Sequence, residues 1–225
     1  MMRVISQCKW LRAVCRTCLA GCAIFLSATG ANARTVILDG RDCDQLAAIS
    51  EAAPRQSWAM NQRSVGAFDT ARVHLAPQQS LLIRFPLTKI PAKQRIAHAE
   101  LLLPLVDFGG SEPRFYLWRL IANWGPGVSY IYRTTQPRLE HWVKPGARGH
   151  SSDRATRPSD VVRLTEKKEV AINVTEDVSL WYSGIAKNNG WMISVEDPEV
   201  AVYLVSPLWE GAQQSWKLRI TYEPR

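Results

Sequence analysis

The sequence predicts an all-β protein of the sandwich type. Two observations support this: apolar residues come in short runs separated by Pro, Gly, Asn and Asp, and the runs are rich in β-branched and aromatic residues. No tract is long enough or apolar enough after residue 33 to suggest a membrane span, and no repeat is visible. The runs are TVIL (35–38), SLLIRF (80–85), AHAELLLPL (97–105), FYLWRLI (115–121), VSYIYR (128–133), EVAINV (169–174), GWMISV (190–195), VAVYLV (200–205) and WKLRITY (216–222).

The amino terminus has the features of a secretory signal peptide. Four basic residues and no acidic one precede an apolar stretch, which ends at the Ala-x-Ala site Ala31–Ala33. We therefore expect residues 1–33 to be removed and an exported protein, periplasmic or extracellular, to begin near Arg34. LAGC at 19–22 offers an alternative, a lipoprotein anchored through Cys22. We prefer the first interpretation because most of the apolar stretch follows that cysteine.

Removal of residues 1–33 changes the charge and the cysteine count. Four of the 28 basic residues lie in that stretch, so 24 remain against 20 acidic ones, a net charge of +4. This balance argues against a nucleic-acid-binding protein. Only Cys43 remains of the five cysteines, which excludes an internal disulfide and a cysteine-based metal site. We expect Cys43 to be a small, partly buried residue and residues 34–225 to form one domain.

Two places have a helical pattern. DCDQLAAISEA (42–52) offers Asp42 as a cap and apolar Leu46 and Ile49 at a spacing of three. TEDVSLWYSGI (175–185) offers Thr175 as N-cap, with Val178, Trp181 and Ile185 on one face and Gly184 near the end. We predict short helices near 42–52 and 176–185.

Residues 138–168 differ from the rest of the chain. They carry eight Lys or Arg and four Asp or Glu, and they contain no clear strand before Val161. A loop of this length inside a domain is either functional or a flexible crossover, and both interpretations remain open.

Four stretches, taken in order, resemble the DNRLRE domain family. They are SLLIRFPLTKIPAKQRIAHAELLLPL (80–105), FYLWRLIANWGPGVSYIYRTTQP (115–137), HWVKPGARG (141–149), and INVTEDVSLWYSGIAKNNGWMISV (172–195) with WKLRITYEP (216–224). The resemblance implies a jelly-roll β-sandwich in exported bacterial proteins, mostly a non-catalytic module beside polysaccharide-degrading enzymes. Some members bind acidic polysaccharide such as alginate. The chain departs from the family where Pro86 replaces an expected aspartate, and where Arg133 stands in place of a tryptophan.

The stretch NWGPGVSYIYRTTQP (123–137) favours a structural role. Alternation places Val128, Tyr130 and Tyr132 on one face of a strand and Ser129, Ile131 and Arg133 on the other. Gly125–Gly127 supply a bend, and we expect Trp124 to close the end of the sandwich.

Sugar binding needs exposed aromatic faces and planar polar groups, and the loop at 138–168 is the best candidate. Trp118, Trp181, Trp191 and Trp216 lie in predicted strands or helices, whereas Trp58, Trp142 and Trp209 lie among turn residues. Arginine binds a carboxylate through two hydrogen bonds. We therefore predict a binding site for acidic polysaccharide; the alternative is that its tryptophan only anchors the loop. Its residues are Trp142, Lys144, Arg148, Arg154 and Arg157.

The sequence offers little support for catalysis. The four histidines, His74, His98, His141 and His150, lack zinc-binding spacing, and no nucleophile-elbow motif is present. We expect no metal and no cofactor. The predicted function is an exported, non-catalytic carbohydrate-binding-like module. A structural or adhesive envelope protein that binds protein, for example in polysaccharide machinery, is the alternative. A uronate-eliminating lyase that uses His141 or His150 with Tyr132 is the third.

Overall fold

A computed structural model describes residues 33–59, 72–110, 112–206 and 215–225. The chain separates into Met1–Gly30 and one compact unit, Ala31–Arg225, and all described residues belong to the second. The predicted signal peptide up to residue 32, the alternative anchor Cys22 and the indole of Trp209 lie outside the described residues. Within the described ranges, no helix has both the length and the apolar character needed to cross a membrane.

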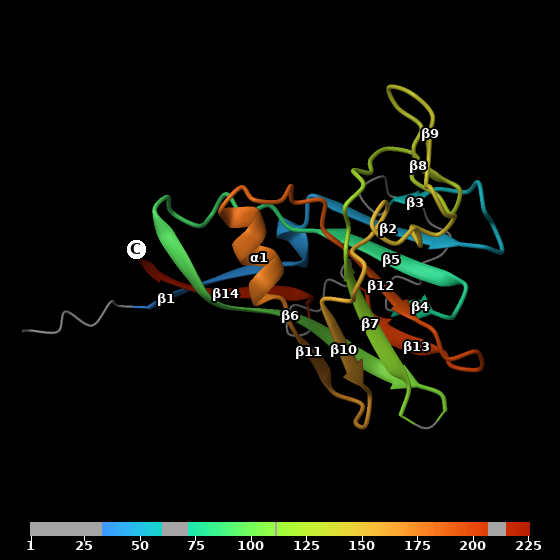
Figure 1. The fold of residues 1–225 in the computed structure, drawn as a ribbon. Helices are drawn as coiled ribbons and strands as arrows, with labels where there is room; N and C mark the ends of the chain where they lie inside the picture. Colours follow the sequence, from blue (N-terminus) through green and yellow to red (C-terminus); the bar gives the residue numbers. More distant parts are fainter. Residues whose placement is uncertain (1–32, 60–71, 111, 207–214) are drawn as a thin grey trace, which may run out of the picture. The chain divides into compact units, whose positions relative to one another are not determined.

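The described chain forms two antiparallel sheets of six strands each and a small hairpin (Figure 1). The first sheet has the order β1-β14-β6-β13-β4, with β11 also paired to β6. Its strands are β1 (Arg34–Asp39), β4 (Arg72–Leu75), β6 (Gln94–Phe108), β11 (Glu169–Asn173), β13 (Val202–Val205) and β14 (Lys217–Pro224). The second sheet has the order β10-β7-β12-β5-β2-β3. Its strands are β2 (Gln45–Ser50), β3 (Trp58–Ala59), β5 (Gln79–Arg84), β7 (Arg114–Arg119), β10 (Asp160–Arg163) and β12 (Trp191–Val195). The hairpin consists of β8 (Tyr132–Thr134) and β9 (Glu140–His141).

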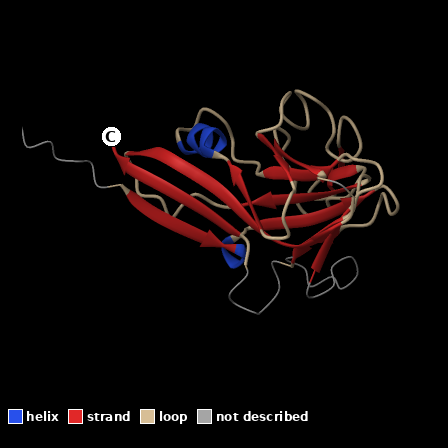
Figure 2. Ribbon diagram, turned by 90° about the horizontal axis from the view of Figure 1, so that it is seen from below, coloured by secondary structure: helices blue, strands red, loops and turns tan. Residues whose placement is uncertain are grey.

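Strands that follow one another in the chain mostly lie in opposite sheets. The path goes from β1 to β2, and later from β4 to β5 to β6 to β7, changing sheet at each step. The apolar faces of the two sheets meet in the main core, where Phe85, Trp191 and Trp216 are fully buried. This arrangement confirms the predicted all-β sandwich (Figure 2).

The predicted helix at 42–52 is wrong. A single 3-10 turn, η1 (Gly40–Asp42), precedes β2. Along β2, Leu46 and Ala48 enter the main core, whereas Ala47 and Ile49 enter a second core on the opposite side of the sheet. A strand that is buried on both faces has no alternation of apolar and polar residues. Over a short run, its apolar residues can therefore fall at the spacing that is typical of a helix.

The second predicted helix is confirmed as α1 (Thr175–Tyr182), but its first residue does not cap it. Val174 occupies the N-cap position, and the Thr175 hydroxyl instead accepts a hydrogen bond from the Ala99 N–H of β6 at 2.9 Å. Val178 and Trp181 are buried as expected, whereas Ile185 is 76% exposed because the helix has already ended before it.

Asp177 joins this helix to the second sheet. Its Oδ2 accepts hydrogen bonds from the Trp191 indole at 2.7 Å and from the Ser159 hydroxyl at 2.5 Å, and its Oδ1 lies 3.0 Å from Arg119 Nε. Burial raises the pKa of Asp177, although these three partners oppose the increase. The carboxylate therefore holds α1, β7 and β12 at fixed positions.

We expect Asp177→Asn to lower the free energy of unfolding by about 3 kcal/mol, because it leaves the mostly buried Arg119 without its counter-charge. Urea denaturation followed by tryptophan fluorescence measures this change. Glu176→Gln, an exposed change at the neighbouring position, is the control and should cost less than about 1 kcal/mol. Equal midpoints for the two variants would contradict the role given to Asp177.

Cys43 is partly buried, as the sequence predicts. Its Sγ donates to the carbonyl oxygens of Gln45 and Arg84, both at 3.0 Å. Burial raises the pKa of the thiol from 9.0 to about 12. Cys43 is thus a protonated, weakly reactive thiol at neutral pH.

A thiol reagent at pH 8 should react with Cys43 about a thousandfold more slowly in the folded protein beginning at Arg34 than in urea, since only the thiolate attacks. The folded-state pKa lies above the unfolded one, so the stability contributed by the protonated thiol is complete below pH 9.0 and is lost as the pH rises toward 12. Comparable labelling rates in the two states would show that the thiol is open to solvent.

Candidate functional site

The outer face of the second sheet is partly covered by residues 121–158, which we call the covering segment. Side chains from this segment and from the sheet form the second core. Its buried members are Ala47, Ile49, Leu82, Trp118, Leu120, Trp124, Val128, Trp142, Ala147 and Met192. Figure 1 shows the segment, with the β8–β9 hairpin, beyond β2 and β5. Most of the long irregular loop is therefore packed onto the sheet.

The predicted strand at 128–133 is wrong for most of its length. Only Tyr132–Thr134 form a strand, and the fully buried Val128 and Ser129 follow the turn at Gly125–Gly127 without joining a sheet. The predicted bend is present: Val128 N–H donates to the Gly125 carbonyl at 3.1 Å, and Gly127 has φ +74°. A Cβ on Gly127 would lie 1.8 Å from the Thr135 hydroxyl, so only glycine fits there.

Trp124 and Trp142 both serve as buried anchors. Trp124 is 3% exposed and donates its indole N–H to the Asn189 carbonyl at 2.8 Å. Trp142 is 4% exposed and donates to the Ser129 carbonyl at 2.9 Å. Trp142 therefore has no open face for a sugar ring, and the geometry matches the alternative in which this tryptophan fixes the loop.

The four predicted basic residues do not form one surface cluster. Lys144 and Arg157 are exposed, Arg148 is half-buried and donates to the Pro77 carbonyl, and Arg154 is 6% exposed. Arg154 is the member that the structure places against the sheet. Its guanidinium carbon lies 3.6 Å from the centre of the Trp118 ring.

A buried carboxylate, Asp153, holds the covering segment in place. Its Oδ1 accepts the Val143 N–H, and its Oδ2 accepts the N–H groups of Lys144 and Gly149, all at 2.9 Å. Its own carbonyl accepts the N–H groups of Ile121 and Ala122, just beyond β7. Asp153 is not among the site residues predicted from the sequence; the available signal was an acidic residue placed between the basic residues Arg148 and Arg154.

One strip of the outer face lies at the border of the second core and is only partly covered. Residues two apart on a strand share a face, so Arg114, Tyr116 and Trp118 of β7 point the same way. The Tyr116 and Trp118 rings are stacked with centres 6.2 Å apart, and Arg114 lies 6.0 Å from the Tyr116 ring. We call Arg114, Tyr116, Trp118 and Arg154 the aromatic row. Tyr116 is its partly exposed ring, and an arginine flanks it on each side.

The row continues into a polar hollow of about 840 Å³, which Arg114 and Arg163 line together with Glu112 and Asp197. Arg114 lies 3.4 Å from Asp197, and Arg163 lies 3.3 Å from Glu112. At the other end, the exposed His150 packs edge-on against Trp118 at 5.6 Å and lies 3.5 Å from Arg154. The aromatic row and its surroundings thus combine an accessible ring with several planar hydrogen-bond donors.

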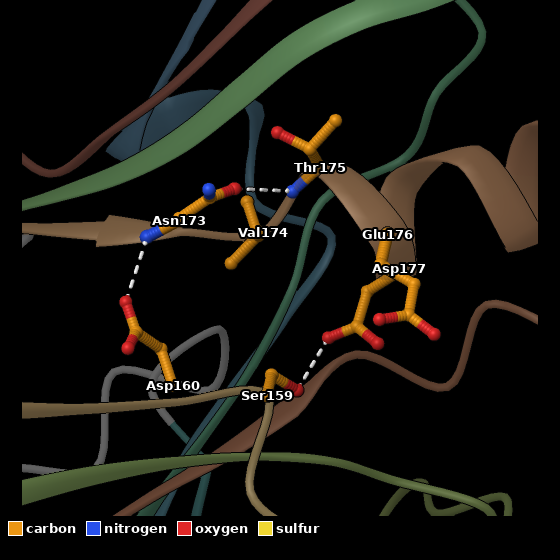
Figure 3. Close-up of a pocket in the computed structure, with 7 residues that line it drawn as sticks. All are labelled: Ser159, Asp160, Asn173, Val174, Thr175, Glu176 and Asp177. Carbon is orange, nitrogen blue, oxygen red and sulfur yellow. Dashed lines mark hydrogen bonds between the residues drawn. The ribbon is translucent and has the colours of Figure 1, made fainter.

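A second pocket, of about 440 Å³, lies where α1 begins (Figure 3). Its acidic groups are largely occupied. Asp160 accepts the N–H groups of Val161 and Asn173, and Asp177 makes the contacts described above. Among the described residues, no group of three or more His, Cys, Asp or Glu could hold a metal ion. This pocket is built around contacts that stabilise the fold.

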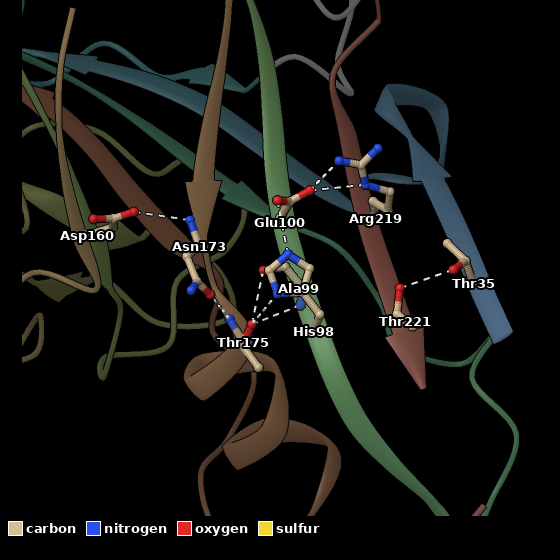
Figure 4. A network of polar contacts seen from close by, with 9 residues as sticks. All are labelled: Thr35, His98, Ala99, Glu100, Asp160, Asn173, Thr175, Arg219 and Thr221. Carbon is tan, nitrogen blue, oxygen red and sulfur yellow. Dashed lines mark hydrogen bonds and ion pairs between the residues drawn. The ribbon is translucent and has the colours of Figure 1, made fainter. Parts of the chain in front are cut away.

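A hydroxyl, an imidazole and a carboxylate meet beside this pocket (Figure 4). Thr175 Oγ1 lies 3.4 Å from His98 Nδ1, and His98 Nε2 lies 3.0 Å from Glu100 Oε1. The Thr175 hydroxyl, however, also bonds both the N–H and the carbonyl of Ala99. The hydrogen bond from Arg219 holds the pKa of Glu100 below its ordinary value. Thr175 is engaged in a contact between α1 and β6, and Glu100 in a contact between β6 and β14. The set has the residue types of a catalytic triad, but its hydroxyl and carboxylate are occupied by contacts that stabilise the fold.

The residues considered for a lyase are split between two places. Tyr132 and His141 meet across the β8–β9 hairpin with ring centres 4.9 Å apart, whereas His150 belongs to the surroundings of Arg154. The arginine beside the first pair, Arg133, forms an ion pair with Glu140 at 2.7 Å. The hairpin therefore does not bring together a catalytic base and an arginine that is free to neutralise a uronate carboxylate.

Asp153→Asn should loosen the covering segment. The single amide oxygen of asparagine cannot accept all three N–H groups that the two carboxylate oxygens accept, and the asparagine NH₂ group would face a backbone N–H donor. We expect a loss of about 2 to 4 kcal/mol, and faster hydrogen exchange at Val143, Lys144 and Gly149 than in the main core. Thermal denaturation and exchange measured by NMR test this. Asp160→Asn is the control, since Asp160 lies outside the segment. Unchanged exchange in Asp153→Asn would show that packing alone holds the loop.

Comparison of the chain with protein-family models and with curated proteins gives no match. The resemblance to the DNRLRE domain stays a prediction from the sequence. Function is therefore inferred from the geometry of the outer face.

Proposed function

We propose that this chain is an exported, non-catalytic carbohydrate-binding-like module that takes acidic polysaccharide on the outer face of its second sheet. The observation that supports this is the aromatic row, in which Tyr116 lies partly exposed between Arg114 and the Trp118–Arg154 stack. The site differs from the one that the sequence suggests, because Trp142 is buried beneath the covering segment.

The chemistry of the row suits a uronate. The apolar face of a pyranose can stack on the Tyr116 ring, and guanidinium groups bind carboxylates in a planar, two-bonded geometry. Lys144 and Arg157 are exposed elsewhere on the covering segment and form no ion pair within the described residues. They add long-range attraction for a polyanion that salt weakens.

A non-catalytic role agrees with the state of the polar groups. Thr175, His98 and Glu100 are engaged by Ala99 and Arg219, and Tyr132 and His141 have no free arginine beside them. Export follows from the predicted signal peptide, and an acidic extracellular polysaccharide is a ligand that such a protein would meet.

Binding to a protein partner is the second candidate. The observation in its favour is a pair of exposed apolar side chains on the covering segment, Leu139 at 55% and Val143 at 76% exposure. Leu139 immediately precedes β9 and Val143 follows it, and neither belongs to the aromatic row. A pull-down that depends on these two residues and not on Tyr116 would favour an adhesive or structural role.

Affinity electrophoresis in gels containing alginate or pectate tests the proposal. Wild-type protein should be retarded, and Tyr116→Ala should weaken binding about three- to tenfold through loss of stacking. Tyr203→Ala is the matched control, because Tyr203 is also partly buried but stacks on His74 in the other sheet.

Equal retardation of wild type and Tyr116→Ala, or none in either acidic gel, would contradict the proposal. Incubation with the same polysaccharides, monitored at the absorbance of the unsaturated product, separates a lyase from a binding module.

A further inference from the structure

Four buried polar atoms on the outer face of the second sheet have no hydrogen-bond partner within the described structure. They are Ser80 Oγ, Ser194 Oγ, Trp118 Nε1 and Arg154 Nε. Their residues are all at least nine-tenths buried, with exposures of 1%, 1%, 6% and 6%. Buried polar atoms in folded proteins are nearly always paired, so a group of orphans on one face suggests a missing partner.

The strand register brings these residues together. Ser194 of β12 lies opposite Ser80 of β5 on one side and opposite Tyr116 of β7 on the other. Directly paired residues project on the same side of a sheet, so both serines share the face of Tyr116 and Trp118. Arg154 stacks on Trp118, and its Nη1 reaches within 3.9 Å of Glu196, which follows β12. The guanidinium therefore extends along the face beside Ser194.

Two arginines, Arg148 and Arg154, lie close to this group of atoms. Arg148 approaches from the other side, where it donates to the Pro77 carbonyl ahead of β5. Burial lowers the pKa of Arg154 to about 10, and the neighbouring Arg148 contributes to this decrease by repulsion. Glu196 is the acidic side chain that forms an ion pair with Arg154, at a long distance. Asp153 also attracts Arg154, but its carboxylate oxygens already accept three backbone N–H groups.

We propose that Arg148, Arg154, Ser80 and Ser194 form a carboxylate-binding subsite, which accepts the carboxylate of a uronate residue in the polysaccharide. Indole and guanidinium N–H groups only donate, and serine hydroxyls can donate, so the missing partner is an acceptor with several lone pairs. A carboxylate provides these lone pairs and the negative charge. This inference rests on the proposed function and identifies the sugar class that the face selects.

The subsite also determines how a sugar would be oriented on the aromatic row. Ser194 lies directly across from Tyr116, so a sugar stacked on that ring can turn its carboxylate toward the serines and Arg154. A neutral sugar would stack equally well but would leave the buried donors unpaired. Selectivity for an acidic sugar over a neutral one follows from this difference.

Isothermal titration with tetragalacturonate and with its fully methyl-esterified form tests the subsite, because esterification removes only the charged carboxylates. Wild-type protein should bind the acid at least about tenfold more tightly than the ester. Ser194→Ala and Arg154→Lys should each remove most of that preference. Ser194→Ala removes a hydroxyl that has no hydrogen-bond partner, so the melting temperature should stay the same or increase. This variant therefore tests the subsite even if Arg154→Lys fails to fold.

Lys187→Ala is the control for general electrostatics, since it removes an exposed charge outside the covering segment and the subsite. It should change the affinities for acid and ester by less than about twofold in physiological salt. Acetate serves as the small free carboxylate and should bind far more weakly than the oligosaccharide. Acetate that binds as tightly as tetragalacturonate would overturn the assignment to a uronate.

The two proposals fail in different ways. Acid and ester bound equally by wild type, Ser194→Ala and Arg154→Lys would mean that the orphan atoms hold only water, and the binding function would stand without the subsite. No binding of either ligand by wild type would remove the proposed function, and the subsite with it.

Discussion

The covering segment depends on one buried group, the carboxylate of Asp153. It gathers three backbone N–H groups of the loop after β9, and its backbone carbonyl fixes the loop to the end of β7. A loop of this length has a high conformational entropy when it is free. Charged hydrogen bonds at one buried point, with Trp142 packed beside them, offset that cost and turn an irregular segment into a second layer.

This second layer changes which residues the outer face of the sheet beneath it must carry. An outer face open to water would carry polar residues at every second position. Instead β2, β5 and β12 carry Ala47, Leu82 and Met192 there, all fully buried. Under the cover the sheet is consequently apolar on both faces, and its strands there resemble those of a buried parallel sheet although every pairing is antiparallel.

The cover also decides where a ligand can be bound. It buries the tryptophans that it carries and leaves Tyr116 partly open at its border. Arg154 leaves the loop at that border and lies flat on Trp118, where a hydrated surface arginine would not stay without such a ring. Asp177 secures the Arg119 end of β7, and Asp197 accepts the N–H of Arg114 at the opposite end. The strand that carries the aromatic row is therefore held at both ends. A rigid strand supports precise placement of a bound sugar better than a free loop.

The sequence by itself determined the all-β class, the helix α1, the bend at Gly125–Gly127 and the half-buried state of Cys43, because each depends on residues close together in the chain. It misassigned 42–52, where both faces of β2 are covered, and 128–133, where the chain is still leaving a turn. Only the tertiary structure decided that Trp142 is buried and that Arg154 lies over Trp118, on the face of the sheet that also carries Ser80 and Ser194. These residues come from the covering segment and from β7, β5 and β12, and no local pattern records which distant strands become neighbours. Which residues are buried on the outer face depends on this pairing of distant strands, so their burial could be identified only from the tertiary structure.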